Sequence, residues 1–153
     1  MIKGAEISKC TKYRYSLWRI WDESKAYVIF IGLNPSTADA VEDDPTIRRC
    51  IKFAESWGFG GIHMMNLFAY RSPEPKKMKQ AIDPIGPEND RWLQTLSEKT
   101  NTVIAAWGNH GTFKNRSQEV MKLLPNLHYL KLNSSGEPSH PLYLKADLKP
   151  IKY

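Results

Sequence analysis

The chain has 153 residues, the size of one ordinary domain, and we expect a single domain over residues 1–153. Hydrophobic residues make up 41% of the chain and charged residues 25%, which excludes disordered, collagen-like and coiled-coil proteins. Lys and Arg outnumber Asp and Glu by 22 to 16, giving a formal charge of +6. This charge is compatible either with a polyanionic partner or with a basic surface that binds nothing.

No apolar run approaches the roughly 18 residues that a membrane-spanning helix requires, and we expect no membrane partner. Residues 1–6 lack the apolar centre of a signal peptide, so a cytoplasmic location is expected. Cys10 and Cys50 are the only cysteines, too few for a four-cysteine metal cluster, and the four histidines lack zinc-site spacing. The sequence therefore predicts no metal and no cofactor.

The chain begins with two predicted strands. Residues 13–21 alternate large apolar side chains with polar ones, which is typical of a half-buried antiparallel strand. Residues 22–25 form a polar turn, and residues 27–31 follow as a buried apolar strand. Because only a short turn separates them, we expect these two strands to pair as an N-terminal hairpin.

Strands then alternate with helices along the rest of the chain. Apolar runs predict strands at residues 62–65, 102–107 and 127–132, and helical spacing predicts helices at residues 46–57, 89–100 and 113–124. Asp44 and Pro45 are good start signals for the first of these helices, and glycines follow its end. Residues 72–85 contain three prolines and predict an irregular connection with one helical turn.

This alternation favours a parallel sheet covered on both faces. We therefore predict an α/β fold, a three-layer αβα sandwich with a mainly parallel four-stranded central sheet plus an N-terminal antiparallel hairpin strand. Ligands of such sheets bind at the carboxyl ends of the strands. The polar residues that follow the predicted strand ends, and that we expect at one edge, are Asn34, Asn66, residues 108–110 and His140.

The loop after the buried strand at residues 27–31 has the composition of a ligand-binding loop. Gly32 permits a close approach of the backbone, Pro35 stiffens the turn, and Ser36 and Thr37 supply hydroxyl groups. Asn34 is the first side chain there that can take part in chemistry. Such a loop suits a phosphate, a sugar or a base, and the alternative is a plain turn.

Taken together, these loops resemble the motifs of the uracil-DNA glycosylase superfamily. The matching stretches are Gly32-Leu33-Asn34-Pro35, Met64-Met65-Asn66, Trp107-Gly108-Asn109-His110 and His140-Pro141-Leu142. Over its whole length the chain is still more similar to a bacterial and phage family, domain of unknown function 1643 (DUF1643). The residues that carry this second resemblance are 32–38, 43–50, 66–69, 86–90 and 140–144.

The glycosylase resemblance implies a role for each motif. Asn34 would hold the attacking water, Asn66 would pair with the edge of the base, and His140 would donate a hydrogen bond to a base carbonyl. Leu142 would fill the space that a flipped base leaves. The alternatives are that Asn34 bonds its own turn, Asn66 caps a strand end and His140 is an exposed loop residue.

Other residues complete the predicted site. Phe68 and Trp107 would stack on a base, or else belong to the core. Ser36, Asn109 and His110 would contact a phosphate, or else cap a helix. The full set of predicted binding residues is Gly32, Leu33, Pro35, Ser36, Asn66, Phe68, Trp107, Gly108, Asn109, His110 and Leu142, beside the catalytic pair Asn34 and His140.

The expected activity is recognition or hydrolysis of an N-glycosidic bond in DNA or a nucleotide. Glycosylases with an aspartate in the first motif have a charge that stabilises the cationic sugar, whereas Asn34 can only orient water. The alternatives are therefore a binding module for a nucleic acid or modified nucleotide without catalysis, and a fold whose loops only cap helices. Asp43 and Asp44 are interpreted as helix caps in preference to a metal-binding pair.

Overall fold

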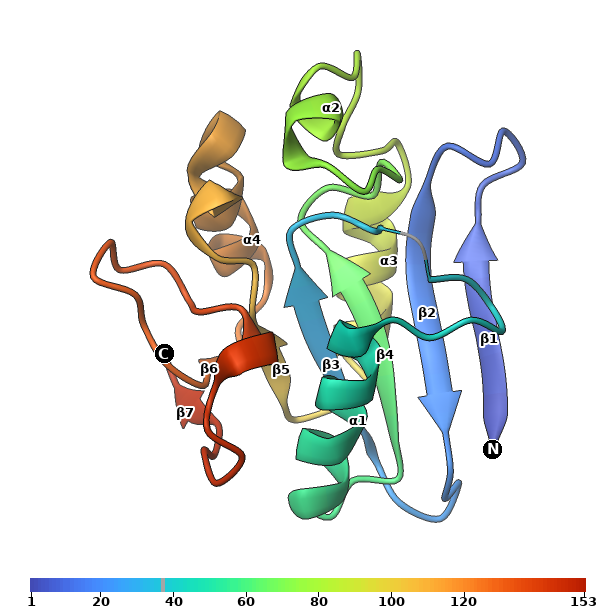
Figure 1. Cartoon of the computed structure of the whole chain (residues 1–153), viewed down its shortest axis with the longest axis vertical. Helices are drawn as coiled ribbons and strands as arrows, with labels where there is room; N and C mark the ends of the chain where they lie inside the picture. The colour runs from blue at the N-terminus through green and yellow to red at the C-terminus, as the bar shows by residue number, and fades with distance from the viewer. Residues whose placement is uncertain (37) are drawn as a thin grey trace.

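A seven-stranded mixed sheet is the centre of the fold in the computed structural model, which describes residues 1–36 and 38–153 (Figure 1). The order of the strands across the sheet is β1-β2-β4-β3-β5-β6-β7. Their bounds are β1 (Ile2–Ile7), β2 (Arg14–Ile20), β3 (Tyr27–Gly32), β4 (Gly61–Asn66), β5 (Val103–Ala105), β6 (Leu127–Tyr129) and β7 (Ile151–Lys152). Strands β4, β3, β5 and β6 run parallel to one another, while β1, β2 and β7 are antiparallel to their neighbours.

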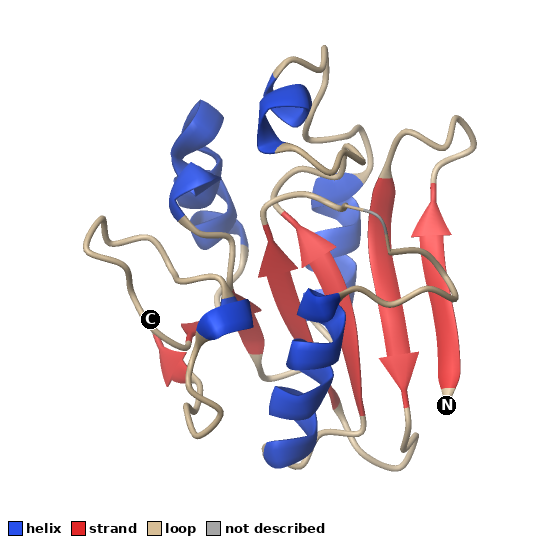
Figure 2. Ribbon diagram, in the orientation of Figure 1, coloured by secondary structure: helices blue, strands red, loops and turns tan. Residues whose placement is uncertain are grey.

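Helices cover both faces of this sheet (Figure 2). Helix α1 (Pro45–Ser56) packs on one face, and α3 (Asn89–Ser97) and α4 (Arg116–Leu123) pack on the other. The alternation of side chains along β3 explains the two cores: Val28 and Phe30 join the core under α1, whereas Ile29 and Ile31 join the core under α3 and α4. The short helix α2 (Pro75–Lys79) and the 3₁₀ helices η1 (Asn109–Asn115) and η2 (Pro141–Tyr143) belong to the connections.

Helix α1 forms where the sequence predicts it. The side chain of Asp44 accepts a hydrogen bond from the backbone N–H of Ile47 at 2.8 Å, and Pro45 occupies the first turn. The buried face of the helix consists of Ile47, Cys50, Phe53 and Ala54. The predicted single turn within residues 72–85 is α2, and the predicted strands at residues 27–31, 62–65, 102–107 and 127–132 correspond to β3, β4, β5 and β6.

The prediction that residues 13–21 pair with residues 27–31 is wrong. Strand β4 lies between β2 and β3, and β2 forms its hairpin with β1, an edge strand that the sequence analysis did not predict. The crossover through α1 returns β4 to the side of β3, so β2 pairs with the outer edge of β4. Gly60 permits this arrangement, because a Cβ atom there would lie 2.0 Å from the carbonyl oxygen of Asp22.

Two further differences concern the C-terminal half. The predicted helix at residues 113–124 begins only at Arg116, because Lys114 and Asn115 have the left-handed backbone conformation and separate η1 from α4. Strand β7 closes the sheet beside β6 and was not predicted. Thr37 of the first loop lies outside the described residues. Among the described residues no helix combines the length and apolarity needed to cross a membrane.

Candidate functional site

A cavity of about 350 Å³ lies at the carboxyl ends of β3, β4 and β5. This position is where open parallel sheets bind ligands, and the volume is that of a site for one small molecule. Its walls contain most of the polar loop residues that the sequence analysis placed at one edge. The lining residues are Arg14, Gly32, Leu33, Asn34, Pro35, Ser36, Asp44, Thr46, Ile47, Met64, Asn66, Ser72, Pro73, Pro75, Trp107, Gly108, Asn109, His110 and His140.

Asn34 holds two loops together through one end of its amide. Its Nδ2 donates hydrogen bonds to the backbone carbonyl oxygens of Pro35 at 3.1 Å, Ser72 at 2.9 Å and Tyr70 at 3.4 Å. These acceptors assign the orientation of the amide, since only the nitrogen can face a group of carbonyls. The side-chain Oδ1 accepts no hydrogen bond from the described residues. Asn34 therefore bonds its own turn, as one interpretation predicted, and keeps an acceptor in a pocket-lining side chain.

Asn66 lines the pocket, and the nitrogen of its side-chain amide has no acceptor in the part of the chain that the structure describes. The residue is 5% exposed, and its Nδ2 is buried without a hydrogen-bond acceptor among residues 1–36 and 38–153. Gly32 lies directly opposite it in the β3–β4 ladder, and a Cβ atom at Gly32 would come within 3.0 Å of Asn66 Oδ1. The absence of a side chain at Gly32 therefore avoids a close contact with the side-chain amide of Asn66. A buried donor without an acceptor is costly in free energy.

His140 contributes a neutral imidazole with a defined tautomer. The backbone N–H of Leu142 donates to its Nδ1 at 3.2 Å, so the ring proton is on Nε2. Desolvation lowers the pKa of His140 below its usual value of 6.5, and the nearby carboxylate of Asp44 partly opposes this shift. At neutral pH the ring is therefore uncharged and Nε2 can donate one hydrogen bond. His140 is an exposed residue, as the alternative interpretation predicted, and it also lines the pocket.

The segment from Trp107 to His110 also lines the pocket, and the side chains of Trp107 and Asn109 are hydrogen-bonded to other residues of the chain. Trp107 is buried, and its Nε1 donates to Oε2 of Glu137 at 2.8 Å. Oδ1 of Asn109 accepts hydrogen bonds from Asn133 at 3.0 Å and Ser135 at 2.6 Å.

His110 lies at the rim of the pocket beside a lysine. Its Nδ1 is 2.9 Å from Nζ of Lys79, which is a donor only, so this ring nitrogen accepts. Asn109 and His110 are exposed at this rim, and Ser36 is exposed on the first loop. The three residues that the sequence interpreted as phosphate contacts therefore all lie where solvent and the pocket meet.

Two predicted site residues lie outside the lining. Phe68 is fully buried in the core beneath the sheet and packs against Phe113, with 5.6 Å between the ring centroids. Its position follows the alternative of a core residue. Leu142 lies on η2 next to the exposed Tyr143, beside the pocket residue His140 but not among the lining residues.

Among the lining residues that were not predicted as part of the site, two are charged, Arg14 and Asp44. Arg14, on β2, is 4% exposed, and only its Nη1 has an acceptor among the described residues, the carbonyl oxygen of Ala38 at 2.9 Å. Burial lowers the pKa of its guanidinium to about 10, so the group stays charged at neutral pH. The available signal in the sequence was an arginine at the start of a strand of alternating apolar and polar residues. Asp44 was interpreted only as a helix cap, and it both caps α1 and lines the pocket.

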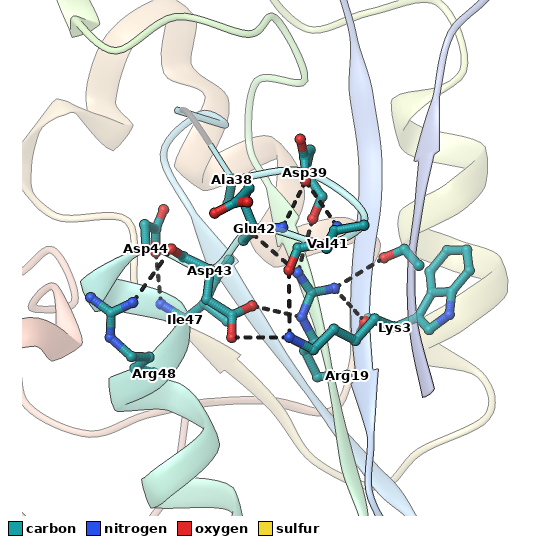
Figure 3. Close-up of polar contacts among 12 residues, drawn as sticks. Lys3, Arg19, Ala38, Asp39, Val41, Glu42, Asp43, Asp44, Ile47 and Arg48 are labelled. Carbon is teal, nitrogen blue, oxygen red and sulfur yellow. Dashed lines mark hydrogen bonds and ion pairs between the residues drawn. The ribbon is translucent and has the colours of Figure 1, made fainter. Parts of the chain in front are cut away.

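The loop that carries Asp44 is fixed in place by Arg19 of β2 (Figure 3). Arg19 is fully buried, and its Nε forms an ion pair with Oδ1 of Asp43 at 2.7 Å. Its Nη2 donates to the carbonyl oxygens of Asp39 at 2.9 Å and Glu42 at 3.2 Å. The position of Asp44 at the pocket thus depends on this neighbouring network. Within residues 1–36 and 38–153, no group of three or more His, Cys, Asp or Glu side chains could hold a metal ion.

Residues 14–142 match the family described as "Protein of unknown function (DUF1643)". The chain belongs to this family. The matched region begins at Arg14 and ends at Leu142, so it includes every residue that lines the pocket. Comparison with curated proteins and with solved structures gives no match.

Proposed function

We propose that this DUF1643 protein binds a nucleobase of DNA or of a nucleotide in the pocket and hydrolyses its N-glycosidic bond. The observation that carries the proposal is the amide of Asn66. Its buried Nδ2 lacks an acceptor among the described residues, and a nucleobase edge offers the acceptors and donors that both ends of an amide can match. The glycosylase-like motifs of the sequence support the same assignment.

In the proposed reaction, Oδ1 of Asn34 accepts a hydrogen bond from the attacking water. The water oxygen forms a bond to C1′ of the sugar, the bond from C1′ to the base nitrogen breaks, and its electron pair stays on the base. Nε2–H of His140 stabilises the negative charge that develops on a base carbonyl oxygen. A proton from the water ends on the base, so the products are the free base and an abasic sugar.

Asp44 supplies the negative charge that Asn34 lacks. Burial lowers the pKa of both Arg14 and His140, and the Asp44 carboxylate partly opposes each shift, which places it within electrostatic reach of both groups. A carboxylate in the pocket would stabilise the cationic sugar of an oxocarbenium-like transition state. In this proposal the first motif orients water while the helix cap provides the charge.

Base release is the experiment that tests this function. Single- and double-stranded oligonucleotides containing uracil, hypoxanthine or hydroxymethyluracil are incubated with the protein and then treated with alkali, which cuts the strand at abasic sites. We expect cleavage with one of these bases, and a decrease of at least about a hundredfold in Asn66→Ala. Asn101→Ala, which alters an exposed asparagine outside the lining, is the matched control.

Binding without hydrolysis is the second candidate function. It is favoured by the amide of Asn34 in the loop after β3. Nδ2 of Asn34 donates to backbone carbonyls, and an amide, unlike a carboxylate, cannot act as a general base. Absence of strand cleavage with every base, together with a base-dependent affinity that Asn66→Ala removes, would select this candidate. Absence of both would refute base recognition.

A further inference from the structure

Three arginines of the described chain are almost completely buried, and one of them differs from the other two. Arg19 pairs with Asp43 at 2.7 Å, and Arg116 pairs with Asp90 at 2.5 Å and Glu119 at 2.6 Å. Arg14 forms no ion pair with any residue in the ranges 1–36 and 38–153. The single hydrogen bond of its side chain to these residues joins Nη1 to the carbonyl oxygen of Ala38.

The unsatisfied donors of the described chain are concentrated at the pocket. The buried side-chain nitrogens and oxygens without partners belong to four residues, which are Arg14, Arg49, Asn66 and Asn126. Arg14 and Asn66 both line the cavity, whereas Arg49 and Asn126 do not. A buried charge without a partner is among the most costly groups in a protein, so its retention at a cavity points to a ligand.

The free edge of the Arg14 guanidinium defines the chemistry of that ligand. Nη1 is engaged with Ala38, while Nε has no acceptor and no acceptor for Nη2 occurs among the described residues. Nε–H and one N–H of Nη2 are parallel donors on the same edge, and this fork matches two oxygens of a phosphate or carboxylate.

The charges around Arg14 leave this edge available to an anion. Among the carboxylates, Asp44 has the largest effect on the pKa of Arg14. Its Oδ1 accepts a hydrogen bond from the backbone N–H of Ile47, and it forms no ion pair with Arg14. Arg71 adds positive charge near Arg14, and His110, which lines the same cavity, is in contact with Lys79. The pocket lining therefore combines one carboxylate, of Asp44, with the guanidinium of Arg14 and the rings of His110 and His140.

We propose that Arg14 binds a phosphate group of the ligand, so that the pocket recognises a nucleotide unit in preference to a free base or nucleoside. This inference rests on the proposed function, because the base is assigned to Asn66. The phosphate belongs either to a free nucleoside monophosphate or to a DNA strand. A second, more open hollow of about 610 Å³ adjoins the pocket across Gly108, Asn109 and His140 and offers room for the neighbouring nucleotides of a strand.

The anion site can be tested with inorganic phosphate alone. The thermal midpoint of the full-length protein is measured with increasing phosphate at constant ionic strength, so that general screening does not change. We expect phosphate to raise the midpoint of the wild-type protein and of Arg91→Met, which removes an exposed arginine of α3. Arg14→Met should not respond, and Arg14→Lys should respond weakly because it keeps the charge and loses the fork. An unchanged response in Arg14→Met, or no response in the wild type, would overturn the anion site.

Binding of nucleosides and nucleotides then separates this inference from the proposed function. Calorimetric titration with a nucleoside, its monophosphate and a single-stranded oligonucleotide should show about a tenfold to hundredfold gain from the phosphate, lost in Arg14→Met. Equal affinity for nucleoside and monophosphate would overturn the role of Arg14 while leaving base binding intact. A phosphate response without any effect of the base, or of Asn66→Ala, would instead refute the proposed function. Tighter binding of the oligonucleotide than of the monophosphate assigns the phosphate to a strand.

Discussion

Arg14 and Arg19 lie five positions apart on the same strand, and their surroundings are opposite in character. Arg19 is surrounded by acceptors: a carboxylate of Asp43 and the backbone carbonyls of Trp18, Asp39 and Glu42 (Figure 3). Arg14 has one carbonyl partner among the described residues and faces a cavity. Both arginines donate hydrogen bonds to the connection between β3 and α1, Arg14 to the carbonyl oxygen of Ala38 and Arg19 to that of Asp39. The comparison shows that the chain itself neutralises Arg19, whereas Arg14 has no ion pair among the described residues. We propose that a ligand supplies the missing partner of Arg14.

Removal of Arg19 should give the largest effect on stability. Arg19→Met leaves Asp43 and several carbonyl oxygens without their donor, and breaking one side of a buried pair costs about 3 to 5 kcal/mol in the free energy of unfolding. Urea denaturation measures this change. Lys3→Met is the control, because it removes only the exposed 3.7 Å contact with Asp43 and should cost less than about 1 kcal/mol. Equal effects of the two substitutions would contradict the distinction between buried and exposed partners.

Acid should lower the free energy of unfolding through His63, a partly buried residue of β4. The ring of His63 is hydrogen-bonded to Ser16 of β2 at 2.9 Å, and burial, with a smaller effect of Lys99, lowers its pKa from 6.5 to about 4. The folded state therefore favours neutral His63. Its contribution is complete above pH 6.5 and is lost as the pH falls through about 4, by an amount on the order of 3 kcal/mol.

Urea denaturation across this pH range checks the prediction. The free energy of unfolding of the wild-type protein should decrease between pH 6.5 and about 4, and His63→Gln should flatten that part of the curve. The difference between the two proteins should be constant above pH 6.5. A curve for His63→Gln that is parallel to that of the wild type at all pH values would argue against His63 as the titrating group.

Removal of Arg14 should raise the free energy of unfolding, whereas removal of Arg19 should lower it. Arg14→Met replaces an uncompensated buried charge with an apolar side chain of similar length, which we expect to raise the free energy of unfolding by about 1 kcal/mol. The gain in stability would accompany the loss of phosphate binding, as is common for groups kept for function. Denaturation with urea in phosphate-free buffer is the measurement. A loss as large as that in Arg19→Met would place Arg14 among the structural arginines.

Asp44 should show the smallest effect on stability because its cap can be preserved. Asn is as good an N-cap as Asp, so Asp44→Asn should change the free energy of unfolding by less than about 0.5 kcal/mol, whereas Asp44→Ala should cost about 1 kcal/mol. Base release should nevertheless fall at least about tenfold in Asp44→Asn, since the negative charge beside Arg14 and His140 is lost. Full activity of Asp44→Asn would remove the carboxylate from the proposed mechanism.

Local patterns were sufficient for the elements whose partners are near in sequence. The cap at Asp44, the proline after it and the apolar spacing that follows predict α1 closely. The apolar runs that end in Asn34, Asn66 and the Trp107–His110 segment predict strands whose carboxyl ends meet, and the pocket contains these residues together with His140. Phe68 also follows the end of a predicted strand, and its aromatic ring is a suitable stacking partner for a base. It is nevertheless buried in the core, because the direction of its side chain depends on the conformation of the whole loop.

By itself, then, the sequence determined the alternation of strands and helices, the polar loops that end the parallel strands and membership in DUF1643. Only the tertiary structure decided that β4 separates β2 from β3, and that β2 brings Arg14 to the pocket and Arg19 to the loop behind Asp44. The reason is physical. Capping and side-chain periodicity act within a few residues, whereas the partner of a buried charge is set by contacts between segments far apart in the chain.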